Sequence, residues 1–69
     1  MISTDEELQQ VNMEVVELYQ NGEYSEAMEL ATQALEFGKK FLGSKHPITT
    51  TSVNNLAILV GKIGDPARV

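Results

Sequence analysis

The 69-residue chain contains no cysteine. It therefore cannot form a disulfide framework, a thiolate zinc site or a cysteine nucleophile. A length of 69 residues also lies just below the ~70–80 residues at which a single hydrophobic core becomes sufficient on its own. We expect one domain, residues 1–69, that lacks a covalent cross-link and gains stability from further contacts.

Long apolar runs are also missing. No stretch approaches the ~20 residues of a membrane span, and residues 1–7 are acidic where a signal peptide is basic and then apolar. We therefore expect a cytoplasmic protein with no membrane partner. Apolar residues make up 42% of the chain and charged residues 22%, which is the composition of a globular protein and not of a disordered segment.

Basic residues are absent from the first half of the chain. Residues 1–36 contain nine acidic residues and no Lys or Arg, whereas residues 37–69 contain all five basic residues and one acid, so the halves carry −9 and +4. A net charge of −5 repels a phosphate backbone, and nucleic acid is not an expected partner. The opposite charges favour an antiparallel or head-to-tail contact between copies, although solvated helix faces account for them as well.

The spacing of apolar residues predicts three helices, over about residues 4–21, 24–42 and 47–63. In the first range, residues three or four apart share one side of a helix: Leu8, Val11, Val15 and Leu18. The second range has its apolar stripe at Tyr24, Ala27, Ala31, Ala34 and Phe41. A short loop between the first two helices makes them antiparallel. The predicted fold class is all-α, an antiparallel helical hairpin followed by a third helix.

Glycine and proline mark the ends of these segments. Asn21-Gly22 and Gly43 are residue types that adopt the left-handed conformation just past a helix. Pro47 suits a first helical turn, where the missing amide costs nothing. Asp65-Pro66 has the form of a further helix start, so we expect the beginning of a fourth helix that the sequence does not complete.

The third predicted helix repeats the first at an offset of 42 residues. This offset pairs Val11 with Val53 and Leu18 with Val60. The chain thus contains one helix–turn–helix unit and the first helix of the next, about one and a half units.

Two stretches carry a family resemblance. Residues 18–27, Leu-Tyr-Gln-Asn-Gly-Glu-Tyr-Ser-Glu-Ala, continuing through Ala31 and Ala34-Leu35, resemble the tetratricopeptide repeat. Residues 41–47, Phe-Leu-Gly-Ser-Lys-His-Pro, and residues 53–57, Val-Asn-Asn-Leu-Ala, are similar to the linker and helix start of the longer repeat found in kinesin light chains and bacterial relatives. The resemblance implies an α-solenoid in which the first helix of each unit lines a concave, peptide-binding groove.

The resemblance places five residues near that groove: Asn12, Val16, Tyr19, Asn54 and Ile58. Asparagine amides can donate to and accept from a peptide backbone, and the aliphatic residues can hold an apolar side chain. Asparagines occupy the positions at which some family members have lysines that clamp a terminal carboxylate. Carboxylate clamping is therefore not expected. A core or subunit contact remains an equal alternative for Val16, Tyr19 and Ile58.

No residue pattern indicates catalysis. His46 is the only histidine and has no thiolate or second imidazole to complete a metal site, so we expect it to serve the start of the third helix. Ser44 and the hydroxyl residues 49–52 lack a base to activate them and are interpreted as caps and helix surface. We predict no enzyme activity, no cofactor and no metal.

The leading functional hypothesis is a protein–protein interaction module that forms a homo-oligomer through its unpaired third helix, most simply as a two-fold dimer, with helix exchange as one form of it. The residues assigned to self-association are Val53, Leu56, Leu59, Val60 and Ile63. One alternative is an adaptor that binds a protein or peptide partner in the groove. Another is that the chain is a fragment of a longer repeat array.

Overall fold

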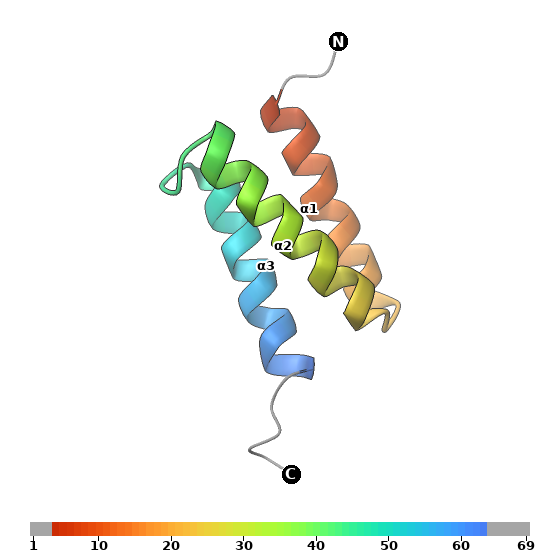
Figure 1. Cartoon of the computed structure of the whole chain (residues 1–69). Coiled ribbons are helices and arrows are strands. Elements are labelled where there is room, and N and C mark those ends of the chain that lie inside the picture. The colour runs from red at the N-terminus through yellow and green to blue at the C-terminus, as the bar shows by residue number, and fades with distance from the viewer. Residues whose placement is uncertain (1–3, 64–69) are drawn as a thin grey trace.

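The computed structural model describes residues 4–63, except for the side chain of Ile63, and these residues form three helices. They are α1 (Thr4–Gln20), α2 (Tyr24–Phe41) and α3 (Pro47–Ile63) (Figure 1). The predicted all-α fold, a helical hairpin followed by a third helix, is confirmed. α1 and α2 each end one residue earlier than expected. The helix start expected at Asp65-Pro66 lies outside the described residues.

Glycines end the first two helices, as their positions in the sequence predict. After α1, Gly22 has a φ of 81°. Its N–H donates to the carbonyl of Tyr19 (3.0 Å) and the N–H of Glu23 donates to the carbonyl of Leu18 (2.9 Å), which is the Schellman arrangement. After α2, Gly43 has a φ of 97° and donates to the carbonyl of Gly38 (2.8 Å). A side chain at either φ is strained, so these turns depend on glycine.

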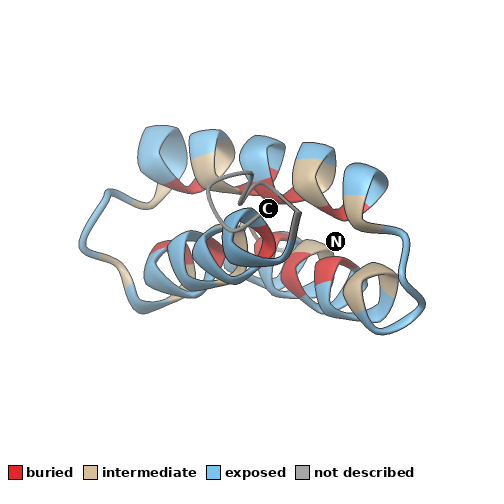
Figure 2. Cartoon of the chain, turned by 90° about the horizontal axis from the view of Figure 1, so that it is seen from below, coloured by how far each residue is buried: buried red, intermediate tan, exposed pale blue. Residues whose placement is uncertain are grey.

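The helices form two layers. α1 and α3 run in the same direction beside each other, and α2 returns antiparallel to both and covers them (Figure 1). The buried residues of α2 face the layer of α1 and α3 (Figure 2). The buried apolar residues are Leu8, Val15, Ala27, Ala31, Ala34 and Leu59. Phe41, which the sequence placed on the buried stripe of α2, is the last residue of that helix and is instead 56% exposed.

The antiparallel return of α2 also redistributes the charge. Lys39 and Lys40 in its last turn lie at the end of the bundle where α1 begins with Asp5, Glu6 and Glu7 (Figure 1). The acidic and basic halves of the sequence are therefore not opposite poles of the folded chain. The acidic surplus lies toward the turn between α1 and α2.

A glycine inside α2 sets how closely the layers approach. Gly38 is buried, and a Cβ added to it would lie 2.7 Å from Thr49 Oγ1 and 3.0 Å from Leu8 Cδ2. Both distances are shorter than ordinary van der Waals contact. Gly38 is thus the point at which α1 and α3 both pack directly on the backbone of α2.

Candidate functional site

A polar cluster joins α1 to α3 beneath the predicted groove. Ser52 Oγ donates to Asn12 Oδ1 (2.7 Å), and Asn12 Nδ2 donates to the carbonyl of Ile48 (3.2 Å). The side chain of Asn55 donates to the carbonyl of Asn12 (3.5 Å). Asn12 is only 5% exposed. Both polar atoms of its side chain are thus engaged within the chain, and a role of Asn12 in binding a peptide stays a prediction.

The face of α3 that packs inward is more polar than expected. Thr49 and Ser52 are fully buried, so their interpretation as helix surface is wrong. Thr49 Oγ1 is buried without a hydrogen-bond partner within residues 4–63. These small side chains fit inward because Gly38 leaves room opposite Thr49 and Asn12 offers an acceptor to Ser52.

Four of the five predicted groove residues line two adjoining hollows between α1 and α3. Val16, Tyr19 and Ile58 line the first together with Asn55, and its volume is about 150 Å³. The second, of about 250 Å³, shares Val16 and Asn55 and is also lined by Asn12. We call the surface formed by Val16, Tyr19, Asn55 and Ile58 the α1–α3 groove. Asn54 is exposed and lines neither hollow, so the neighbouring Asn55 takes the place that the sequence assigned to Asn54.

The residues assigned to self-association separate into different environments. Leu59 is 1% exposed and packs with Val15, Ala27 and Ala31 in the core of the single chain. Its assignment to a contact between copies is therefore wrong. Leu56 is partly buried against the same cluster. Val53 and Val60 are 44% and 48% exposed, and Ile63 lies outside the residues whose side chains are described.

The 42-residue repeat relates buried positions of one helix to exposed positions of the other. Val15 of α1 is buried, whereas its equivalent on α3, Ala57, is exposed. Conversely, Leu59 is buried, whereas its equivalent on α1, Glu17, is exposed. α3 thus packs against the rest of the chain through one side. Another side of α3, which the repeat relates to the buried side of α1, faces solvent. We call this exposed side, formed by Val53, Ala57 and Val60, the outward face of α3.

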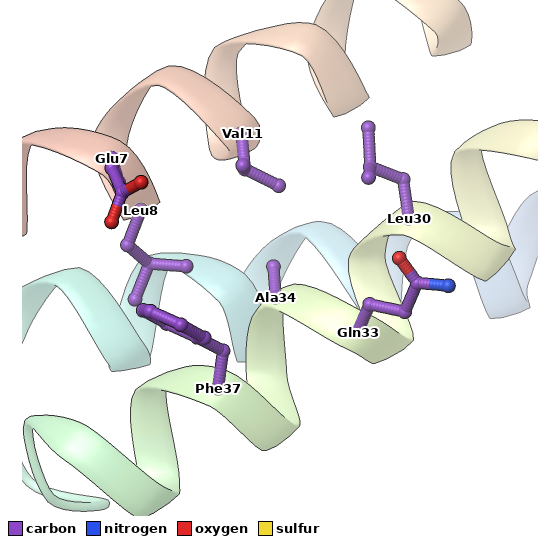
Figure 3. A pocket seen from close by; sticks show the side chains of 7 residues that line it. All are labelled: Glu7, Leu8, Val11, Leu30, Gln33, Ala34 and Phe37. Carbon is purple, nitrogen blue, oxygen red and sulfur yellow. The ribbon is translucent and has the colours of Figure 1, made fainter. Parts of the chain in front are cut away.

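A further apolar surface lies between α1 and α2, and the sequence did not single it out. Figure 3 shows apolar side chains of both helices pointing into the space between them. This α1–α2 crevice has a volume of about 200 Å³ and is lined by Glu7, Leu8, Val11, Leu30, Gln33, Ala34 and Phe37. The spacing of its apolar residues along the sequence is that of residues in a hydrophobic core. Only the packed structure shows which of these residues remain partly exposed to solvent.

Next to the crevice, the ring of Phe37 packs against the exposed ring of Phe41. The centroids of Phe37 and Phe41 lie 4.7 Å apart, and Lys40 Nζ lies 5.4 Å from the centroid of Phe41. Such exposed aromatic surface is typical of places where proteins contact one another.

His46 holds the start of α3. Its Nδ1 accepts a hydrogen bond from the N–H of Ile48 (3.1 Å), and its carbonyl accepts one from the N–H of Thr50 (2.9 Å). The first bond satisfies an amide that a helix start leaves without an intrahelical partner, and the second is the first i→i−4 bond of the helix. The predicted structural role of His46 is confirmed.

Neither a metal site nor a membrane span is found in the described part of the chain. No group of three His, Cys, Asp or Glu residues in that part is close enough to hold a metal ion. None of its three helices combines the length and apolarity needed to cross a bilayer. Comparison with family models, curated proteins and solved structures finds nothing that matches this chain.

Proposed function

We propose that the chain is a non-catalytic protein–protein interaction module of the tetratricopeptide type, which binds a second copy of itself through the outward face of α3. The observation that carries the proposal is the exposure of Val53 (44%) and Val60 (48%) in a single chain. Their repeat equivalents on α1, Val11 and Leu18, are both partly buried. The outward face of α3 is therefore a surface of the kind that packs against another helix.

Charge supports the choice of α3 as the contacting helix. α1 and α2 together contain eight acidic residues, whereas α3 contains none and has Lys62 as its only charged residue. Two copies of a chain with net charge −5 repel each other least where acidic side chains are absent. α3 is the helix that meets this condition.

The apolar area involved indicates a reversible association. Burying the exposed half of a valine side chain contributes about 1 kcal/mol. Two such valines on each of two copies therefore contribute about 4 kcal/mol if α3 packs only against α3, which offsets no more than the lowest estimate, about 4 kcal/mol, of what association costs in translational and rotational freedom. Tighter association requires a larger apolar partner surface.

The experiment is sedimentation equilibrium of the wild-type chain and two double variants across a range of protein concentrations. Val53→Glu with Val60→Glu places carboxylates on the outward face of α3 and should give a monomer. Val16→Glu with Ile58→Glu adds the same charge to the α1–α3 groove and should associate like the wild type. Circular dichroism of both variants checks that the helices are retained. Equal association of both variants would contradict the proposal.

The α1–α3 groove supports a second candidate function, that of a peptide-binding adaptor. Val16 and Ile58 are 40% and 52% exposed and line the same hollow as Tyr19. Asn55 also lines it, and its side-chain carbonyl can accept a bond from a peptide N–H. A peptide-display library selected on the wild-type chain tests this function. Selected peptides should lose binding to the Val16→Glu, Ile58→Glu variant and keep binding to the variant with glutamates on the outward face of α3.

A further inference from the structure

We infer that copies of the chain associate head-to-tail, with the outward face of α3 of one copy docked in the α1–α2 crevice of the next. This inference rests on the proposed self-association through α3 and adds the surface that receives the helix.

The α1–α2 crevice offers apolar surface that the single chain leaves open. Its floor is formed by Leu8 and Ala34, which are buried, and its sides by Val11, Leu30 and Phe37, which are only partly buried (Figure 3). All of its lining residues come from α1 and α2. The α3 helix of the same chain therefore leaves this surface open.

The crevice and the incoming helix have matching residue spacing. Along α2, Leu30, Ala34 and Phe37 are four and three residues apart, which places them on one side of the helix. The outward face of α3 repeats this spacing and the same order of large, small and large side chains, at Val53, Ala57 and Val60. Anchors with such spacing are typical of a helix that lies in an apolar groove.

The chain already contains one contact of this kind. Val11 of α1 lines the crevice beside Leu30, Ala34 and Phe37, and Val11 is the repeat equivalent of Val53. The α2 residues Leu30, Ala34 and Phe37 therefore already lie beside a valine of α1, and the equivalent valine of α3 is exposed. In the complex, α3 of the second copy packs on the side of these α2 residues that faces solvent.

Charge also selects α3 as the occupant. Glu7 lines the crevice, and α1 and α2 of an approaching copy present mainly acidic residues, which it repels. An approaching α3 presents Lys62 as its only charge. Phe41, exposed one turn beyond Phe37, extends the apolar surface along which this helix lies.

A two-fold contact between α3 helices would leave both the crevice and Phe41 uncovered in every copy. The head-to-tail contact covers the crevice of each copy except the one at the end of a chain of copies. This contact joins two different surfaces, so a pair of copies still has one free α3 face and one free crevice. Further copies can therefore add, and the complexes grow as the protein concentration rises.

The test is complementation between two blocked variants, measured by sedimentation equilibrium alone and in equimolar mixture. The first variant, Val53→Glu with Val60→Glu, blocks the outward face of α3. The second, Gln33→Glu with Phe41→Glu, places one carboxylate in the crevice and one on the apolar surface that extends it, at two exposed positions that do not belong to the core. Each variant alone should be a monomer of about 7.6 kDa. Their mixture should form a complex of two chains and nothing larger, because one intact α3 meets one intact crevice.

A matched control has the same two types of substitution on another face of α1. Gln10→Glu with Met13→Glu also replaces one amide and one exposed apolar residue, and it should associate like the wild type. If the crevice variant alone associates like the wild type, head-to-tail docking is overturned while self-association through α3 stands. If the wild type is itself a monomer, or if the α3 variant associates, the proposed function fails as well.

Discussion

The hydroxyl of Ser52 donates a 2.7 Å hydrogen bond to Oδ1 of Asn12 and thereby joins α3 to α1 inside the protein. Both residues are buried, at 0% and 5% exposure. A buried hydrogen bond of this kind requires both partners, because each polar group left alone loses its bond to water without replacement. The pair therefore joins α1 to α3 at one register.

Replacement of Asn12 by Ala should lower the free energy of unfolding by about 1–3 kcal/mol, because it leaves the hydroxyl of Ser52 without its acceptor and opens a small cavity. Asn54, the exposed repeat equivalent of Asn12, is the matched control. Asn54→Ala should change the free energy of unfolding by no more than about 0.5 kcal/mol. Urea denaturation followed by circular dichroism measures both. Equal losses would show that Asn12 is not a structural residue.

Two hydroxyls with the same burial should differ in their contribution to stability. Ser52→Ala removes the donor to Asn12 and should cost about 1–3 kcal/mol. Thr49→Val removes a hydroxyl that has no hydrogen-bond partner within residues 4–63, so we expect a change within about 1 kcal/mol. Denaturation of the two variants at one protein concentration compares them. A larger loss for Thr49→Val would mean that its hydroxyl is bonded after all.

Gly38→Ala should destabilise the protein although alanine favours a helix. The gain in helix propensity is about 1 kcal/mol, whereas the new Cβ would meet Thr49 Oγ1 at 2.7 Å, and such overpacking costs about 1–3 kcal/mol. We expect a net loss of about 1 kcal/mol. Gly61→Ala on α3 is the control, because a Cβ there has no atom within 4 Å and should raise stability by about 0.5–1 kcal/mol. Thermal unfolding measures whether each substitution raises or lowers stability. Stabilisation by both substitutions would contradict the close approach at Gly38.

His46 should be replaceable by a residue that caps a helix. His46→Ala removes the acceptor of the Ile48 amide and should cost about 1 kcal/mol, whereas His46→Asn should restore most of the loss. Lys45→Ala, an exposed change one residue away, serves as the control and should be nearly neutral. Thermal unfolding of the three variants tests this order. An Asn variant as unstable as the Ala variant would show that capping is not what His46 contributes.

The sequence predicted the helices well because their signals are local. The spacing of Leu8, Val11 and Val15 and the left-handed glycines at positions 22 and 43 act within a few residues, and the structure has helices at these places. The hairpin follows from the short loop at residues 21–23. No long-range information was needed for the fold class.

The inward side of α3 was not predictable from its own residues. Ile58, Leu59 and Val60 are consecutive apolar residues, yet only Leu59 is buried, so periodicity does not select the buried side. The choice depends on Gly38 and Asn12, which lie on other helices and provide space and an acceptor. Asn54 and Asn55 differ by one helical step, and only the packed structure shows that Asn55 faces α1.

The central claim is that the chain associates with itself through α3, and the average molar mass of the wild-type chain in solution tests it most directly. Sedimentation equilibrium across increasing concentration should give a mass that rises above the 7.6 kDa of one chain. A mass of 7.6 kDa at every concentration, with the helical circular dichroism intact, would contradict the claim.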